Sequence, residues 1–363
     1  MKTFLIILLL IPVISTAQIV SPTNYEVISI LGEEIEVSLL NPFKNEEKVK
    51  VIINDSKDNL IYEKEIQSES SNTIKISLNE QLRVRRKEWL TLYLFKDDKL
   101  VDSKKFGLGL IFLTAGQSNS TNSHKVMLDR TISNLVSAKK SENEFIKLER
   151  SEMGDIVPNV EDLFLSDFKN RSSIWPYLGD KLVETYNVPI AFVNIGYSGS
   201  AIERWNSNTS TNDKLTTGLR QRLEFAKGHK YNGVLWHQGE ANSKIPSDEN
   251  IDVPRAQKYH DELLKLIEES RVLLNQEDLV WFVSITSRIC KWEGEDDSIK
   301  HDPYIAQAQK DIIENGPNVL AGPNTNLIEH ECHFDTRDSL SNFVDTWFDQ
   351  LIFSGEFALL GSF

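Results

Sequence analysis

The chain has 363 residues, of which 40% are hydrophobic, and this is enough for a large core in one or two domains. Its 54 acidic residues outnumber the 40 basic ones and give a net charge of −14. This charge argues against a nucleic-acid partner, because phosphates require clustered Lys and Arg. The one basic cluster, residues 83–87, lies between two strand-like segments and is interpreted as a solvated loop.

The first 17 residues have the features of a secretory signal peptide. Lys2 is followed by an apolar run, residues 4–14, and then by small residues that end at Ala17. The run is too short for a membrane span, which needs about 20 apolar residues. A lipoprotein would need a cysteine directly after the cleavage site, but the first cysteine is Cys290. The sequence therefore predicts a secreted or periplasmic protein that starts near Gln18 and has no membrane anchor.

Residues 18–107 show a hydrophobic period close to two and no helical period. They contain six short segments rich in Val, Ile, Leu and aromatic residues, namely residues 34–40, 48–53, 60–66, 73–78, 88–95 and 99–106. Asp97 and Asp98 lie between the last two segments and predict a hairpin turn. We expect a small antiparallel β-sandwich domain, which serves as a spacer or contacts an extended substrate.

From residue 108 onward, apolar segments of strand length alternate with segments of helical period. The expected strands are residues 110–113, 189–195, 231–236, 279–285 and 318–322. The expected helices are residues 172–186, 214–226, 254–274, 305–314 and 339–353. This order predicts a parallel sheet with helices on its faces, in one α/β domain over residues 108–363.

Three of the expected strands end in polar turns that contain glycine. The first turn, residues 116–119, reads G-Q-S-N, and its Ser118 is a candidate nucleophile because reactive groups of α/β folds lie at strand ends. The second, residues 196–205, reads G-Y-S-G-S-A-I-E-R-W, and the third, residues 236–242, reads W-H-Q-G-E-A-N. A fourth segment, residues 329–335, reads E-H-E-C-H-F-D and supplies two histidines. Their joint presence in this order indicates an acyl-transfer site.

These four segments resemble the SGNH hydrolase superfamily, and especially its sialate O-acetylesterase-like and acetylxylan-esterase-like carbohydrate esterases. The resemblance extends over residues 112–334 and implies a flavodoxin-like, three-layer α/β/α domain. It implies that Ser118 is the nucleophile and His333 the general base. It also implies an oxyanion hole formed by the backbone N–H groups of Ser118 and Gly199 and by the side chain of Gln238. The implied activity is hydrolysis of O-acetyl groups on carbohydrates, without a cofactor.

The chemistry of these residue types agrees with such roles. A serine hydroxyl becomes a good nucleophile when an imidazole takes its proton, and the same imidazole can then protonate the leaving sugar hydroxyl. Loss of one oxyanion donor typically costs about 10² to 10³ in rate. Glu240 and Asn242 are expected to brace the third turn by hydrogen bonds.

The acid that should orient the general base is missing from its usual place. In the family an aspartate usually stands three residues before the histidine, and this chain has His330 there. Glu329 and Glu331 flank that position, so the acid is one of them, another carboxylate, or absent from a Ser–His dyad. The alternative function is therefore a catalytically weak or inactive carbohydrate-binding protein on the same fold.

Other motifs near these segments have weaker chemical interpretations. His330 and His333 are three residues apart and not four as in H-E-x-x-H, so no metal site is expected. Ser198 is a weaker candidate nucleophile, because its segment is one glycine short of G-x-S-x-G. Cys332 is either a reactive thiol or the disulfide partner of Cys290, and the two cysteines of the chain are too few for a disulfide scaffold.

The resemblance does not choose between a sialic acid and a xylan substrate. An anionic sialic acid would favour a cation near the site, and Arg204 and Arg288 are available. The remaining histidines outside the motifs are expected to be surface or packing residues: His124, His229, His260 and His301.

Overall fold

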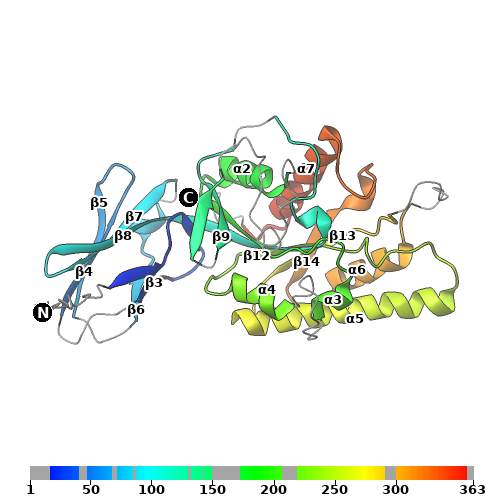
Figure 1. Cartoon of the computed structure of the whole chain (residues 1–363), viewed down its shortest axis with the longest axis horizontal. Coiled ribbons are helices and arrows are strands. Elements are labelled where there is room, and N and C mark those ends of the chain that lie inside the picture. Colours follow the sequence, from blue (N-terminus) through cyan, green and yellow to red (C-terminus); the bar gives the residue numbers. More distant parts are fainter. Residues whose placement is uncertain are drawn as a thin grey trace, which may run out of the picture.

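The computed structural model in Figure 1 has a β-rich N-terminal part next to an α/β part that holds all the longer helices. It describes residues 17–40, 47–67, 72–84, 87–129, 132–141, 143–148, 172–206, 219–290 and 300–357. Apart from Ala17, the expected signal peptide lies outside the described residues, as do residues 214–218 of one expected helix. Within these ranges, no helix has both the length and the apolar content that a membrane span requires.

The N-terminal part consists of two sheets that share one hydrophobic core. The first sheet contains β1 (Gln18–Ser21), β3 (Glu34–Leu40) and β6 (Thr73–Ser77). The second contains β2 (Glu26–Ser29), β4 (Lys48–Asn54), β5 (Leu60–Gln67), β7 (Trp89–Lys96) and the start of β8 (Lys99–Gly116). Alternate residues of β3, β4 and β7 are buried in that core, which explains the period of two in the sequence.

The N-terminal part departs from the expected antiparallel sandwich in two places. Strand β2 pairs with β8 in parallel, because β2 reaches β8 from a distant part of the chain and not through a hairpin. Helix α1 (Glu80–Arg83) was not expected. Arg83 ends this helix and donates hydrogen bonds to Ile30 O and, at 2.7 Å, to Gly32 O. The expectation of a solvated basic loop is therefore wrong for Arg83, because its guanidinium satisfies two backbone carbonyls.

Strand β8 connects the two parts without interruption. At its start it pairs with β7 of the N-terminal part. At its end it pairs with the strands on either side of it in the α/β part, β11 (Ile190–Asn194) and β12 (Gly233–His237). Residues 99–105 are exposed or half-buried, whereas every residue from Phe106 to Gly116 is buried. The expected domain boundary, between Gly107 and Leu108, falls inside this strand, and the division into domains stays a prediction.

The second part is built on five parallel strands. They are β8, β11 (Ile190–Asn194), β12 (Gly233–His237), β13 (Trp281–Ile285) and β14 (Val319–Asn324). Their spatial order is β11-β8-β12-β13-β14, which is the doubly wound order 2-1-3-4-5. Two further strands extend the β11 edge, β9 (Val136–Ser141) in parallel and β10 (Glu144–Lys147) antiparallel to β9. These two were not expected, because Lys and Ser in β9 interrupt the apolar pattern.

Helices cover both faces of this sheet (Figure 1). On one face lie α2 (Trp175–Tyr186) and α7 (Arg337–Phe353), whose buried side chains share a core with Phe112 and Phe192. The other face carries α3 (Ile202–Asn206), α4 (Leu219–Ala226), α5 (Glu249–Leu274) and α6 (Pro303–Asn315). Their buried side chains pack with Ile111 and Val193. Neighbouring residues of β8 and β11 thus enter opposite cores, which is why both strands are apolar throughout.

Helix α5 begins earlier than the sequence predicted. The helical period of the sequence predicted a helix that starts at Pro254. The helix begins instead at Glu249, where the Asp248 side chain accepts the N–H of Asn250 at 2.8 Å. Asp252 strengthens this start by accepting the N–H of Ser247 at 2.7 Å. Two acidic caps therefore determine the helix start, and Pro254 lies within the second turn.

Candidate active site

The polar turns predicted from the sequence lie at the carboxyl ends of the parallel strands. Strand β8 is flanked by β11 on one side and β12 on the other, so the strand order reverses at β8. In doubly wound sheets the ligand crevice forms at this reversal, beyond the carboxyl ends of the strands. The first, second and third turns follow β8, β11 and β12 and therefore border the same crevice.

The first turn depends on a glycine that packs directly against β12. Gly116 has φ +130°, and a Cβ on it would lie 2.0 Å from His237 O. The next residue, Gln117, donates its N–H to His237 O at 2.9 Å. Ser118 then begins a 3₁₀ turn, is 7% exposed, and accepts hydrogen bonds on its carbonyl from both N and Oγ1 of Thr121. The backbone around Ser118 is therefore held rigidly.

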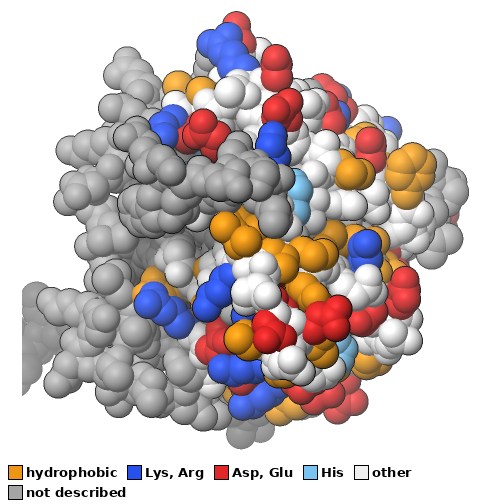
Figure 2. Space-filling view, turned by 90° about the vertical axis from the view of Figure 1, so that its right-hand side faces the viewer, with side chains coloured by type: hydrophobic (Ala, Val, Ile, Leu, Met, Phe, Trp, Pro, Cys, Tyr) orange, Lys and Arg blue, Asp and Glu red, His pale blue; other side chains and the backbone are white. Residues whose placement is uncertain are grey.

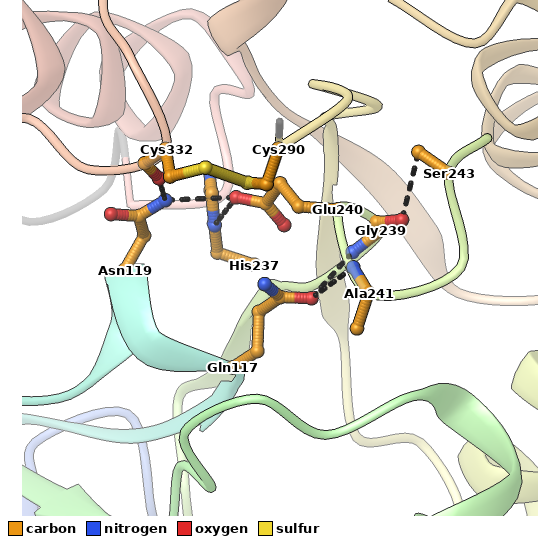
Figure 3. The surroundings of a disulfide bond; sticks show 9 residues. All are labelled: Gln117, Asn119, His237, Gly239, Glu240, Ala241, Ser243, Cys290 and Cys332. Atoms are coloured by element: carbon orange, nitrogen blue, oxygen red, sulfur yellow. Dashed lines mark hydrogen bonds and ion pairs between the residues drawn. A yellow bond between two sulfur atoms is a disulfide. The ribbon is translucent and has the colours of Figure 1, made fainter. Parts of the chain in front are cut away.

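Hydrogen bonds connect the first turn to the third and the second. Gln117 Oε1 accepts the N–H of Ala241 at 3.0 Å and that of Gly239 at 3.4 Å (Figure 3). From the second turn, Tyr197 donates its N–H to Gly116 O at 2.8 Å. The three turns after β8, β11 and β12 thus form one hydrogen-bonded unit.

Gly199, the predicted oxyanion donor of the second turn, is exposed. It has φ +67°, and apart from its two chain neighbours no atom of the described residues lies within 4 Å of the place where a Cβ would be. The backbone conformation, and not a lack of space, is therefore the reason for glycine here. Ser198, the weaker candidate nucleophile, is half-buried beside it.

Gln238, the predicted donor of the third turn, is fully buried. Its Nε2 donates to Asn242 Oδ1 at 2.8 Å and to Ser200 O at 3.1 Å. Gln238 can therefore serve as an oxyanion donor only by releasing one of these acceptors. Asn242 also donates to Glu203 Oε2 and accepts the N–H of Ile202, both at 3.0 Å, so it braces the third turn against the second as expected.

The fourth segment is attached to the first turn and to the end of β13. Asn119, which follows Ser118, donates from Nδ2 to Cys332 O at 3.0 Å, and Cys332 forms a disulfide with Cys290 (Figure 3). Of the two alternatives for Cys332, the structure therefore supports the disulfide. His333 follows Cys332 and is half-buried, so the predicted general base is anchored beside the turn that carries Ser118.

Glu240 occupies the space between the first turn and the fourth segment. Its Oε1 accepts a hydrogen bond from Asn119 Nδ2 at 2.8 Å and lies 3.7 Å from His237 Nδ1 (Figure 3). Burial raises the pKa of Glu240, while the hydrogen bond and the charges of His330 and His333 act in the opposite direction. Within the described residues, Oε2 of Glu240 has no hydrogen-bond partner. This carboxyl group braces the first turn and also acts on the histidines.

The two glutamates that flank His330 face the solvent. Glu329 has a side chain that is 96% exposed and lies 3.9 Å from Lys300 Nζ, and Glu331 is also exposed. The carboxyl groups of Glu240 and Asp335 both act electrostatically on His333. Neither was predicted in this role from the sequence. The available signals were an acid directly after Q-G and an acid two residues after the histidine.

Asp335 is occupied by a different partner. Its carboxylate accepts the N–H of Lys125 at 3.0 Å and forms an ion pair with Lys125 Nζ at 2.9 Å. Burial raises the pKa of Asp335, but the hydrogen bonds and charge of Lys125 outweigh burial and bring the pKa below its ordinary value. Asp335 therefore holds the first-turn loop at Lys125 next to the fourth segment.

His330 cannot replace the missing aspartate. Its ring stacks on Phe334 with 4.1 Å between ring centroids, and its Nδ1 lies 2.7 Å from Ile328 O. Burial lowers the pKa of His330 to about 4, so the ring is neutral near pH 7. An uncharged, packed imidazole does not supply the negative charge that stabilises an imidazolium.

The histidines outside the motifs pack or pair as expected. His124 is fully buried near Phe334 and Phe343, and burial lowers its pKa to about 3. The others contact acidic or basic neighbours: His229 with Glu26, His260 with Asp261, and His301 with Arg288 through a β-bridge. Across the described ranges, no group of three His, Cys, Asp or Glu side chains is arranged to hold a metal ion.

Arginines near the second turn have two different roles. Arg204 is exposed on α3, whereas Arg288 is half-buried after β13. Arg222, which the sequence analysis did not single out, is buried and donates to Ile195 O at 2.9 Å and to Gly196 O at 2.7 Å. Arg222 therefore fixes the start of the second turn, while Arg204 and Arg288 are the cations closer to solvent.

The face seen from the right-hand end of Figure 1 carries hydrophobic side chains in a central band between groups of charged residues (Figure 2). A histidine side chain borders this band (Figure 2). Exposed apolar residues also lie after β12 and β14, at Ile245 and Leu327, and in the first two turns of α5, at Ile251 and Val253. A partly apolar surface with a polar border is typical of a ligand-binding face.

Comparisons with known proteins agree with this fold and identify the family. The structure is similar to that of a carbohydrate acetylesterase from Xanthomonas citri, with a TM-score of 0.58 and 14% identity over 89% of this chain and 72% of that one. A protein from Arabidopsis thaliana matches with a TM-score of 0.47 and 15% identity, over 67% of this chain and 97% of the other. No curated protein matches the chain.

Residues 109–343, more than half of the chain, match the family described as "Carbohydrate esterase, sialic acid-specific acetylesterase". This segment contains the four polar turns and the strands that carry them. The chain therefore belongs to the sialic acid-specific acetylesterase family of carbohydrate esterases, which are carboxylic ester hydrolases.

Proposed function

We propose that the protein is a serine esterase that removes O-acetyl groups from carbohydrates through an acyl-enzyme on Ser118. The observation that carries this proposal is the hydrogen-bonded unit of four turns around Ser118, which includes the anchor of His333 through Asn119 and Cys332. The doubly wound strand order, with helices on both faces, supports assigning the sheet to the SGNH-type three-layer fold.

The proposed reaction has two steps. In the first, His333 takes the proton of Ser118 Oγ while this oxygen attacks the acetyl carbonyl, and the N–H groups of Ser118 and Gly199 stabilise the oxyanion. The tetrahedral intermediate then expels the sugar hydroxyl, which receives the proton from His333. In the second step, water attacks the acetyl carbonyl while His333 takes its proton, the bond between the acetyl carbon and Ser118 Oγ breaks, Oγ receives the proton from His333, and acetate leaves. Gln238 contributes by fixing Ser200 next to Gly199.

We further propose that Glu240 is the acid that orients His333 and stabilises its protonated form. Glu240 is buried, acts on His333 electrostatically, and has an oxygen without a partner among the described residues. Asp335 is the weaker candidate, because its carboxylate already pairs with Lys125. A carboxylate contributed by the third turn would explain why the position of His330 needs no aspartate.

Export to the periplasm or the medium is part of the proposal. The apolar run after Lys2 and the small residues before Gln18 support a signal peptide. The disulfide between Cys290 and Cys332 fits an oxidising compartment. Sequencing the N-terminus of the protein recovered outside the cytoplasm tests this, and a chain that retains Met1 there would contradict it.

The nucleophile is tested by comparing two serines of the same crevice. Ser118→Ala is expected to reduce acetate release from 4-nitrophenyl acetate by about 10⁴-fold or more, because acyl transfer loses its nucleophile. Ser198→Ala, the matched control, is expected to keep most of the activity. Activity that persists in Ser118→Ala and disappears in Ser198→Ala would assign the nucleophile to Ser198.

The substrate is tested by measuring acetate release from O-acetylated sialic acid and from acetylated xylan. Exposed Arg204 and half-buried Arg288 favour an anionic sugar, so kcat/KM is expected to be higher for the sialic acid. Binding of either glycan by the intact chain without any acetate release would favour the alternative function, an inactive carbohydrate-binding protein. That alternative is supported by the missing aspartate, for which Glu240 offers a replacement, and by the β-rich N-terminal part.

A further inference from the structure

A cavity of about 830 Å³ lies where the N-terminal sheet meets the α/β part. Its floor is formed by β7 and β8, one wall by the turn between β4 and β5, and the other by residues 134–135 and Lys147 of the α/β part. None of the residues predicted for the active site lines it. Its volume is within the range of small-molecule and saccharide-sized sites, which is about 300–1,000 Å³.

Aromatic side chains form the floor of this junction cavity. Strand β7 buries every second residue in the sandwich core and presents Trp89, Thr91 and Tyr93 on its outer face, where all three line the cavity. On β8 the partners of Thr91 and Tyr93 are Lys105 and Ser103. The solvent side of an antiparallel sheet usually carries polar residues. Trp89 packs partly against the core of the α/β part, so Tyr93 is the large ring of this face that indicates a surface for a ligand.

Tyr25 completes the aromatic surface in a conformation that is unfavourable for its backbone. It has φ +62°, a left-handed value that is unfavourable for a residue with a Cβ. Its N–H donates to Lys105 O at 2.7 Å, and its ring meets Trp89 edge to face at 5.3 Å. Trp89 is fixed in turn by a hydrogen bond from Nε1 to Asn134 O at 2.9 Å. The rings are therefore positioned before any ligand binds.

Most polar groups around these rings that remain available to a ligand are hydrogen-bond donors. The acidic side chains of the lining have partners within the chain: Asp55 accepts the N–H groups of Lys57 and Asn59, Asp58 accepts the hydroxyl of Tyr93 at 3.4 Å, and Glu88, just before β7, accepts the N–H of Ser56. The cations of the lining include the exposed Lys87 and Lys105. Ring faces bordered by amine donors suit a ligand with an apolar face and many oxygen atoms.

We propose that the junction cavity is a non-catalytic binding site for a glycan chain. The C–H faces of pyranose rings would pack on Tyr93 and on the part of Trp89 that lines the cavity, while Lys147 Nζ already lies over the Tyr25 ring at 5.3 Å from its centroid. The hydroxyl or carboxylate oxygens of the sugars would accept hydrogen bonds from the lysines. Strand β8 separates Lys105 at the cavity from Gly116 at the active site, a distance of roughly 35 Å along an extended strand. The cavity therefore retains the polymer that carries acetyl groups and does not hold the ester that reacts.

The test measures retention of the full mature chain by immobilised glycans, with Ser118→Ala as the parent so that acetyl groups stay intact. The probes are acetylated glucuronoxylan, sialylated mucin and, as an acidic polymer without sugar, polyglutamate. Tyr93→Ala is expected to weaken glycan binding about five- to tenfold, because one stacking ring is lost. Tyr93→Phe keeps the ring and is expected to bind like the parent. Phe353→Ala, which removes an aromatic ring that is 80% exposed on α7, is the matched control.

Equal retention of Tyr93→Ala and Phe353→Ala would overturn the proposal, as would polyglutamate binding as strong as glycan binding. Thermal unfolding of each variant shows whether the loss of binding comes from misfolding, and Tyr93→Phe separates loss of the ring from loss of the hydroxyl. Preference for glucuronoxylan or for mucin identifies which sugar the cavity takes. Hydrolysis of 4-nitrophenyl acetate is measured for Tyr93→Ala in a chain that retains Ser118. This small ester reports on the active site alone, so failure of the esterase proposal can be distinguished from failure of the glycan-binding proposal.

Discussion

The two ends of β8 place the same strand in opposite environments. At its start, Lys99–Lys105 are exposed or half-buried, and this half pairs with β7 beside the junction cavity. At its end, Phe106–Gly116 are buried between parallel neighbours and lead to Ser118. One end uses aromatic rings on an outer sheet face, and the other uses buried polar groups that hydrogen-bond between turns.

We propose that this difference separates holding a polymer from reacting with an ester. At the active-site end, Gln117, Gln238 and Glu240 are buried, and their hydrogen bonds join turns that are far apart in sequence. A change there should alter catalysis and folding. Rings at the cavity end contact one another but carry no reacting group, so a change there should alter only retention of the glycan. Each prediction below tests one side of this contrast.

The largest effect is expected for Glu240. Glu240→Gln keeps an oxygen that can accept the hydrogen bond of Asn119 but removes the negative charge beside His333. We expect kcat for 4-nitrophenyl acetate to fall by about 10³- to 10⁴-fold with little change in glycan retention, as when the orienting acid of a triad becomes an amide. Stopped-flow and steady-state kinetics measure this loss.

Glu329→Gln and Asp335→Asn are the controls for Glu240. Glu329 is exposed, so its variant is expected to match the parent enzyme. Asp335→Asn is expected to lose stability through Lys125 and to retain most of kcat. If Asp335→Asn loses activity and Glu240→Gln does not, the orienting acid is Asp335.

The first turn, which contains Ser118, was predictable from the sequence because the residues that indicate it are adjacent in the chain. An apolar run before G-Q-S-N identifies a strand that ends in a tight turn, and Leu110–Gly116 has that structure. The hydrogen bond of Glu240 with Asn119 and its electrostatic interaction with His333 were not predictable in the same way, because both residues lie far away in the chain. The sequence motif of the family places the acid three residues before the histidine. It therefore cannot indicate a carboxylate that comes from another turn.

The extra strand β9 was missed for a related reason. Its V-S-A-K-K-S sequence contains Lys139, which reads as a surface residue but is 2% exposed. Its Nζ lies 3.0 Å from His229 Nε2 and over the ring of Phe225 at 5.2 Å from the centroid. A buried lysine with tertiary partners hides the hydrophobic period on which strand prediction depends. Tyr25 is similar, since nothing local indicates its left-handed backbone.

A large effect on stability is expected for the glycine before Ser118. In Gly116→Ala the new Cβ would lie 2.0 Å from His237 O, so β8 and β12 would have to separate at the crevice. We expect the free energy of unfolding to fall by about 4 kcal/mol, with loss of ester hydrolysis. Gly228→Ala is the matched control, because Gly228 also has positive φ but open space around it. Equal losses in both variants would show that strain alone, and not contact between the turns, explains Gly116.

A smaller effect is expected from pH, through the buried histidines near the crevice. The pKa of His124 is lowered to about 3 by burial, so the unfolded chain takes up a proton at higher pH than the folded chain. Stability is therefore complete above pH 6.5 and falls as the pH decreases, by about 3 kcal/mol at pH 4 for this one group. Glu240, whose pKa is raised, acts in the opposite direction.

His124→Phe isolates the contribution of His124. Urea unfolding at pH 7 and pH 4 is expected to show a loss on acidification that is about 3 kcal/mol smaller in this variant than in the parent. His260→Phe, a change on the partly exposed side of α5, is the control and should keep the pH dependence of the parent. The same acid sensitivity in both variants would mean that His124 does not stay neutral in the folded protein.

The smallest effect is expected for the disulfide, which holds the His333 segment without touching the reacting groups. Replacing both Cys290 and Cys332 by Ser removes the covalent link between the segment after β13 and the fourth segment. The backbone carbonyl of residue 332 stays in place as the acceptor for Asn119. We expect the free energy of unfolding to fall by about 2 kcal/mol and kcat by a few-fold, because the unfolded chain gains freedom and His333 is held less firmly. The parent enzyme with a reductant should behave in the same way, and glycan retention should not change. A double variant that keeps the parent's kcat would show that the hydrogen bond from Asn119 is enough to position the general base.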